Sequence, residues 1–313
     1  MSKERKLNIK SLRELLLVGV VILLAIIWTI INPQFLSGSN ISNIFRQASY
    51  TAIAAVGMTM VIIIGEIDLS AGSLVCASGL VGAVICKSSG NVVLAVLGAL
   101  VVGVVVGAAN GILCAIGKLP GFIASLASMT ILRGLAYIMT GGNSVVWKNE
   151  TFTMIGTGYI GIVPVPVIIM LIVIILGIIL TTKTRFGRYI YAVGGNIEAS
   201  RWSGIAVTKV KILVYIIMGV LTSVAGLIIT ARLGSGQPSA GTGFEMDCIT
   251  AAVVGGTSMS GGRGKVLGTI VGVLLLTVLT NGMTLLGMNT YWQQVLKGVI
   301  IVVSVLADTR GKK

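Results

Sequence analysis

The stretch 91–116 reads NVVLAVLGALVVGVVVGAANGILCAI and contains no Asp, Glu, Lys or Arg. A helix that spans a bilayer needs roughly 20 consecutive, mostly apolar residues. This stretch is long enough and apolar enough to meet that requirement. It therefore predicts a helix that crosses a membrane, and it marks the chain as a membrane protein.

The composition of the whole chain supports the same interpretation. The 313 residues are 55% hydrophobic and 10% charged, with a mean hydropathy of +1.03, whereas soluble domains carry about 25% charged residues. The 42 glycines indicate membrane helices whose backbones approach closely. A net charge of +14 would suggest nucleic acid as the partner of a soluble protein. In a membrane protein it indicates basic cytoplasmic loops, so we expect membrane lipid and no nucleic acid as a partner.

Apolar segments recur along the chain and predict an all-α, polytopic bundle of about ten spans. These spans are 15–31, 48–64, 69–86, 91–116, 121–140, 163–182, 210–232, 244–260, 266–286 and 291–307. With the N-terminus in the cytoplasm, 17 basic residues fall inside and four fall outside, namely Arg46, Lys87, Lys148 and Arg232. This asymmetry follows the positive-inside rule and predicts that both termini are cytoplasmic.

Residues 1–313 are predicted to form a single transmembrane domain. Its soluble parts are a cytoplasmic tail 1–14, an extracytoplasmic loop 141–162 and a cytoplasmic loop 183–209. A folded domain needs at least about 50 residues, so the chain has no room for an ATPase domain. The chain lacks histidine and a CxxC pair, and 258–265 departs from a phosphate loop. We therefore expect neither a bound cofactor or metal nor an enzyme active site on this chain.

A short polar break separates the second and third predicted spans, and it contains Gly65, Glu66, Asp68 and Ser70. Membranes tolerate such a break only where protein or water covers it. Carboxylates are costly inside a membrane, so these residues are candidates for the translocation path or its gate. The alternative is structural: Asp68 or Ser70 caps the third span, where the helix dipole favours an acid.

Four further charged residues are candidates for the same path, namely Arg133, Glu245, Asp247 and Lys297. Thr242 and Glu245 have the spacing of a capping box, so a structural role is the alternative for the two acids. The two basic residues fall within spans, near the outer ends. There a long basic side chain can reach the membrane surface instead of lining a path.

The loop 183–209 is the most basic part of the chain. A glycine pair breaks it, an asparagine suited to an N-cap follows, and a later glycine is suited to end a helix. This pattern predicts a cytoplasmic helix of about two turns, on which Glu198 and Arg201 can pair. The helix either docks a cytoplasmic partner or belongs to a basic loop that only fixes topology. The candidate docking residues are Arg188, Gly194, Gly195, Asn196, Glu198, Ala199, Arg201 and Gly204.

Three ordered motifs give the chain a resemblance to a known family. They are AVGMT at 55–59 with GEIDLSAGS at 65–73, GRYIYAVGGN at 187–196 with Ala199, Arg201 and Gly204-Ile205, and a block from Gln237-Pro238 through Glu245 and Asp247 to VGGTS at 254–258. The sequence resembles the permease subunits of ABC importers for monosaccharides, of the ribose, galactoside and xylose type. It departs from the family's usual pattern at Glu66 and Trp202.

The resemblance implies a subunit of a larger machine in the bacterial plasma (inner) membrane. A second permease copy, identical or related, would complete the path for a monosaccharide such as ribose or galactose. Cytoplasmic ABC ATPase subunits, which bind ATP and Mg, would dock around 194–204, and an extracytoplasmic sugar-binding protein would deliver the solute. From the residues alone, an ion-coupled secondary transporter and a passive solute channel stay open as alternatives.

Overall fold

The computed structural model describes the backbone of residues 9–310 and the side chains of residues 15–306. Residues 1–8 of the predicted tail 1–14 lie outside the described residues. The described part forms 13 α-helices, a 3₁₀ helix and four two-residue strands, in the order α1 (Ile9–Ile31), η1 (Pro33–Leu36), α2 (Gly38–Ile63), α3 (Ala71–Ser89), α4 (Val92–Ala115), α5 (Gly121–Thr140), β1 (Val145–Val146), α6 (Glu150–Thr157), β2 (Tyr159–Ile160), β3 (Val163–Pro164), α7 (Val165–Lys183), α8 (Arg185–Gly195), α9 (Ile197–Trp202), α10 (Val207–Leu233), β4 (Ser235–Gly236), α11 (Phe244–Val254), α12 (Val266–Leu285) and α13 (Thr290–Arg310).

Six helices of the described part are long and apolar enough to cross a membrane: α3, α4, α5, α7, α10 and α12. Helices α1 and α13 contain shorter apolar stretches, Leu15–Ile31 and Thr290–Leu306. The prediction of an all-α membrane bundle is confirmed at this level. The strands are only two residues long each and form two small antiparallel ladders outside the helices.

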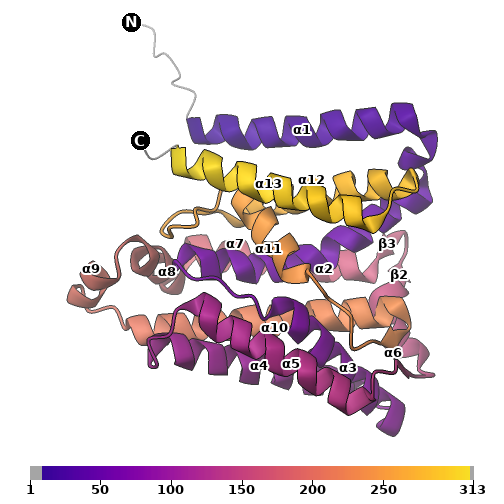
Figure 1. Cartoon of the computed structure of the whole chain (residues 1–313), viewed down its shortest axis with the longest axis horizontal. Helices are drawn as coiled ribbons and strands as arrows, with labels where there is room; N and C mark the ends of the chain where they lie inside the picture. The colour runs from indigo at the N-terminus through magenta and orange to yellow at the C-terminus, as the bar shows by residue number, and fades with distance from the viewer. Residues whose placement is uncertain (1–8, 311–313) are drawn as a thin grey trace, which may run out of the picture.

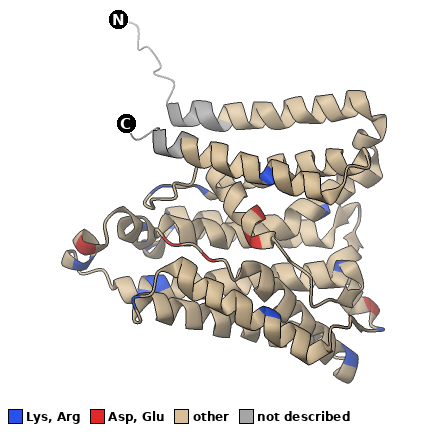
Figure 2. Cartoon of the chain, in the orientation of Figure 1, with Lys and Arg blue, Asp and Glu red and all other residues tan. Residues whose placement is uncertain are grey.

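The long helices run roughly side by side along the long axis of the molecule (Figure 1). Helices α8 and α9 lie at one end of the bundle, and α6 lies at the other end (Figure 1). The start of α1 and the end of α13 lie at the same end as α8 and α9 (Figure 1). Figure 2 shows that charged positions gather toward the two ends, with a few charges inside the bundle on α5, α11 and α13.

Helix α10 lies at the centre, against α2, α3 and α4. Its contact with α4 depends on small residues, since Gly103, Gly107 and Gly111 of α4 all face α10. A Cβ atom at Gly107 would collide with the Tyr215 carbonyl and would lie 2.8 Å from the Cα atom of Ile216. Small residues spaced four apart allow this close approach of membrane helices. The glycines of α4 thus form a packing surface for α10.

Helix ends are set by local signals. Asn91 starts α4, because its side chain accepts a hydrogen bond from the Leu94 N–H at 3.1 Å. Gly90, with φ 68°, ends α3 in the left-handed conformation that other residues rarely adopt. The resulting two-residue turn keeps α3 and α4 adjacent and antiparallel.

Two crossings of the bundle are interrupted. Helix α11 has 11 residues and a length of about 16 Å, whereas a bilayer core is about 30 Å thick. The prediction of a full span at 244–260 is therefore wrong: the helix ends at Val254, and the non-helical segment 237–243 precedes it. The segment 64–70 precedes α3 in the same way, and both α3 and α11 begin near mid-length of the bundle (Figure 1).

Candidate translocation path and coupling face

The two interrupted crossings meet inside the bundle. A Cβ atom at Gly72, in the first turn of α3, would collide with the Glu245 carboxylate and the Gly241 carbonyl. Nearby, the Cys76 Sγ lies 3.2 Å from the Pro238 carbonyl oxygen. The N-terminal ends of α3 and α11 therefore lie side by side. Helix N-termini carry partial positive charge, which suits the carboxylate between them.

Glu245 is the residue at this meeting point. It is 5% exposed, and its Oε2 atom has no hydrogen-bond partner among the described residues. The predicted capping box is not formed. The Thr242 hydroxyl donates to the Ser239 carbonyl at 2.8 Å, and the N-cap of α11 is Gly243, which has φ 79° and no side-chain cap. A carboxylate with an unused buried oxygen is suited to accept a hydrogen bond from a passing hydroxyl group.

Arg133 of α5 supports the non-helical segment 237–243. Its Nη1 atom donates to the carbonyl oxygens of Pro238 at 2.7 Å and Ala240 at 2.8 Å. These carbonyls lack helical partners, so the guanidinium satisfies them inside the bundle, together with the Cys76 thiol at Pro238. The alternative that Arg133 reaches for the membrane surface does not hold in this structure.

Asp68 holds the first break in place. It is 2% exposed, and its Oδ1 atom accepts hydrogen bonds from the Ser70 N–H at 2.8 Å and the Ser70 hydroxyl at 2.6 Å. The network continues through the Asn110 amide, which donates to the Ser70 Oγ at 3.1 Å and accepts from Ser128 at 2.5 Å. Ser70 is the N-cap of α3 by position, but its side chain makes no cap bond. The break is thus tied to α4 and α5.

Glu66 links the same break to two more elements. Its Oε1 atom pairs with the Lys211 Nζ of α10 at 2.5 Å, and its Oε2 atom accepts from the Gly121 N–H of α5 at 2.9 Å. Both charged side chains are largely buried, at 14% and 12% exposure. They line a cavity of about 330 Å³ that Glu198 and Arg201 of α9 also line. From the sequence, Lys211 counts only as one of the 17 basic residues on the cytoplasmic side, and nothing indicates its pairing with Glu66.

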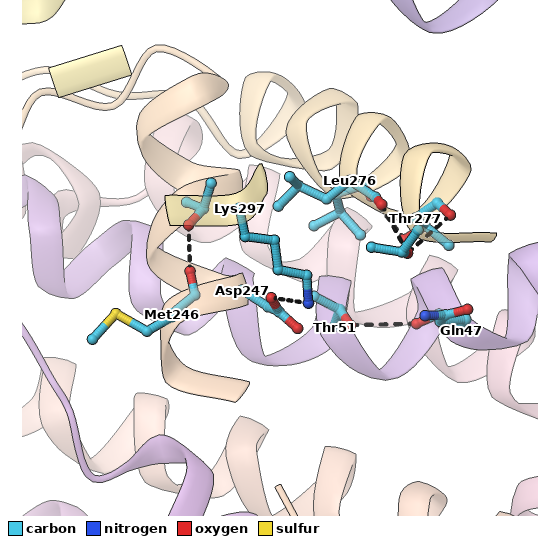
Figure 3. Close-up of polar contacts among 10 residues, drawn as sticks. Gln47, Thr51, Met246, Asp247, Leu276, Thr277 and Lys297 are labelled. Atoms are coloured by element: carbon cyan, nitrogen blue, oxygen red, sulfur yellow. Dashed lines mark hydrogen bonds and ion pairs between the residues drawn. The ribbon is translucent and has the colours of Figure 1, made fainter. Parts of the chain in front are cut away.

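Asp247 and Lys297 form an ion pair between α11 and α13. The Lys297 Nζ lies 2.6 Å from the Asp247 Oδ1, and both side chains are about three-quarters buried. Figure 3 shows Lys297 reaching toward Asp247 beside Thr51 of α2. The lysine therefore points into the bundle and not toward the membrane surface. The pair forms a second polar group beside the meeting point of the two breaks.

Helix α9 is the short helix that the sequence predicts after Asn196. The Asn196 side chain accepts from the Ala199 N–H at 2.9 Å, Glu198 pairs with Arg201 at 2.9 Å, and Gly204 follows with φ 79°. The glycine pair behaves differently from the prediction. Gly194 and Gly195 do not break the chain; they form the last turn of α8, and the turn comes at Asn196. Sequence reasoning missed α8, which also carries the exposed Arg188.

The reason for a glycine at 194 is a contact between three main chains. A Cβ atom there would collide with the Ile63 carbonyl at the end of α2 and lie 2.7 Å from the Gly262 nitrogen. The Gly262 N–H itself donates to the Ile63 carbonyl at 2.8 Å. We call Ile63, Gly194 and Gly262 the three-way junction. It joins α8 to the start of the first break and to the loop 255–265 that follows α11.

Tyr191 of α8 fastens the junction. Its hydroxyl donates to the Gly264 carbonyl at 2.9 Å. Burial raises the pKa of Tyr191 above its ordinary value, so the phenol keeps the proton that it donates. The residues of the described part include no group of three or more His, Cys, Asp or Glu side chains that could hold a metal ion.

Comparison with known proteins gives a consistent family. Residues 40–305 match the family described as the permease component of the branched-chain amino acid transport system. The ribose import permease protein RbsC of Escherichia coli is 46% identical over 301 residues, covering 94% of this chain and 92% of the relative. RbsC of Bacillus subtilis is 44% identical (92% and 90% covered), and the xylose transport system permease protein XylH of Haemophilus influenzae is 35% identical (96% of each).

No solved structure matches the chain. The family match covers most of the chain, and the relatives match it from end to end at identities well above those of chance. The bacterial permease relatives, together with six helices that are long and apolar enough to cross a membrane, place the protein in the bacterial plasma (inner) membrane. The chain belongs to this family of transport-system permease components, as a permease subunit of an ABC importer and not as an enzyme.

Proposed function

We propose that this chain forms the translocation path for a monosaccharide such as ribose or galactose, as the permease subunit of an ATP-driven importer. The meeting of two interrupted crossings around Glu245 carries the proposal. Non-helical backbone at such depth is tolerated where it is buried or lines a path, and broken helices mark transport sites. The names of the relatives point to ribose and xylose as solutes. The ion pairs Glu66–Lys211 and Asp247–Lys297 leave little net charge there, which suits a neutral sugar.

The proposed topology has ten crossings with both termini in the cytoplasm. The non-helical segment 64–70 and α3 together make one crossing, and the segment 237–243 and α11 together make another. The number of crossings therefore stays even. The start of α1, the end of α13 and the α8–α9 segment lie at one end of the bundle (Figure 1). The basic residues of 183–209 support a cytoplasmic position for that end, by the positive-inside rule.

The α8–α9 segment is the proposed docking site for the ATPase subunits. Those subunits, and not this chain, bind ATP and Mg. Trp202 at the end of α9 is 90% exposed. An exposed tryptophan on a short, capped helix is suited to fill a pocket on a partner protein. The three-way junction connects this segment to the start of the first break and to the loop that follows α11, so a movement of α8 is passed to both elements.

Two further partners are proposed. A second permease copy, identical or related, completes the path. An extracytoplasmic sugar-binding protein docks at the end that carries α6. The ladder between β1 and β4, with Val145 opposite Gly236, ties the loop 141–162 to the segment that leads into the second break. A protein bound to this loop therefore acts on the backbone next to the path.

The test is co-purification with the ATPase subunits, followed by sugar uptake in vesicles. We expect uptake of labelled ribose to need ATP and the binding protein, and to exceed equilibrium. Uptake that persists without ATP and follows a proton or sodium gradient would show a secondary transporter. Uptake that only equilibrates the sugar would show a channel.

A further inference from the structure

An apolar cavity opens on the outer surface of the bundle between α2, α7 and α10. It has a volume of about 260 Å³. Val56 and Met60 of α2, Leu176 and Leu180 of α7, and Ile217 and Leu221 of α10 line it. Leu176 is 59% exposed at the rim, so the cavity is open to the surroundings of the bundle. In a membrane those surroundings are acyl chains.

One end of the cavity reaches Thr184, which is the N-cap of α8. Lys183 and Arg185 flank this residue, and Arg188 follows one turn later; all three are exposed. Among the described residues, no ion pair or side-chain hydrogen bond involves any of these three cations. The acid of this segment, Glu198, already pairs with Arg201. The residues on either side of Thr184, next to the cavity, thus carry positive charge without a partner.

An apolar cavity beside unpaired cations fits a ligand that has a hydrocarbon chain and a negatively charged head. Anionic phospholipids have this chemistry, and basic pockets between membrane helices at the cytoplasmic side bind their head groups. We propose that one anionic phospholipid of the inner leaflet binds here, with an acyl chain in the cavity and its phosphate at Lys183 and Arg185. The leaflet assignment rests on the topology given under the proposed function; the binding itself does not.

The site lies where a lipid controls the coupling segment. The Thr184 hydroxyl accepts from the Gly187 N–H at 3.0 Å and donates to the Leu180 carbonyl at 2.6 Å. It therefore sets the bend between α7 and α8, and the cavity ends at this bend. A bound lipid fills the space between α7 and α10, which are the two helices that enter and leave α8–α9. The lipid would hold the segment in the position that the ATPase subunits contact.

The test measures lipid retained by the purified full-length chain. Native mass spectrometry would follow phosphatidylglycerol and phosphatidylethanolamine with identical acyl chains. The head-group variant is Lys183→Gln with Arg185→Gln, and Lys87→Gln together with Lys148→Gln is its control, because both lysines lie at the other end of the bundle. The cavity variant is Ile217→Trp, and Leu171→Trp, on the exposed side of α7, is its control.

We expect about one phosphatidylglycerol per chain, retained at least about tenfold over phosphatidylethanolamine, since each nearby cation favours the anionic lipid. The head-group variant should lose the preference for phosphatidylglycerol, and the cavity variant should lose the bound lipid. Both controls should keep the lipid and the preference. Equal retention of the two lipids, or full retention in either site variant, would overturn the proposal. Leu176→Trp gives a second filling variant at an exposed position if Ile217→Trp does not fold. Retention is measured without ATPase subunits or sugar, so failure here is distinct from failure of the transport function.

Discussion

Replacing Gly194 tests the mechanical link between the ATPase subunits and the path. A Cβ atom at this position collides with the Ile63 carbonyl and crowds the Gly262 nitrogen at 2.7 Å, so Gly194→Ala must separate the three main chains. The separation breaks the 2.8 Å hydrogen bond from Gly262 to Ile63. A lost buried backbone hydrogen bond costs about 1–3 kcal/mol, and overpacking adds about 1–3 kcal/mol. The contact should thus weaken by about 2–6 kcal/mol.

Even the lower end of this range exceeds the 1.4 kcal/mol that corresponds to about a tenfold change in an equilibrium. We expect the assembled Gly194→Ala complex to hydrolyse ATP while the amount of sugar moved per ATP falls at least about tenfold. The assay compares phosphate release with labelled sugar uptake in the same proteoliposomes. Gly195→Ala is the matched control, because a Cβ atom there meets nothing within 4 Å. Normal coupling in the Gly194→Ala complex would refute the assignment of the three-way junction.

Three other variants probe separate features. Glu66→Gln leaves Lys211 largely buried without its ionic partner. The thermal midpoint of unfolding should fall by an amount that corresponds to about 3 kcal/mol, and an unchanged midpoint would contradict a structural role for the pair. Gly107→Leu should prevent α4 and α10 from packing and remove folded protein from size-exclusion profiles, whereas Gly134→Ala, with open space around it, should not. Trp202→Ala should weaken ATPase binding by about 2 kcal/mol without lowering the thermal midpoint, because the side chain is 90% exposed; equal affinity would remove it from the interface.

Local signals account for the features that the sequence predicts correctly. The N-cap of α9 and its internal ion pair involve residues three apart, and the apolar stretch 91–116 corresponds closely to α4. Composition does not distinguish a half-length helix from a full span, because the predicted span is uniformly apolar or small from Cys248 to its end at Ser260. The missing information is the support that Arg133 gives to the segment 237–243 from about 105 residues away.

The pairings of the candidate site are also long-range. Lys211 and Glu66 are 145 residues apart in the chain, and nothing near either residue indicates the other. Asn110 did carry a signal, since it is one of few polar residues inside the apolar stretch 91–116, and the structure places it in the Asp68 network. The helix α8 was missed because two consecutive glycines usually indicate a break, whereas here the close contact with Ile63 requires Gly194 to lack a side chain inside a helix.

The three-way junction consists of main-chain atoms and two glycines. Its geometry therefore does not depend on which side chains the surrounding surfaces carry. With the proposed docking site and path, residues on the outer face of α9 can change to fit a different ATPase subunit, and residues along the path can change to fit a different sugar. Neither kind of change disturbs the contact between Ile63, Gly194 and Gly262. Such a permease can diversify in evolution at both working surfaces while the transmission between them stays the same.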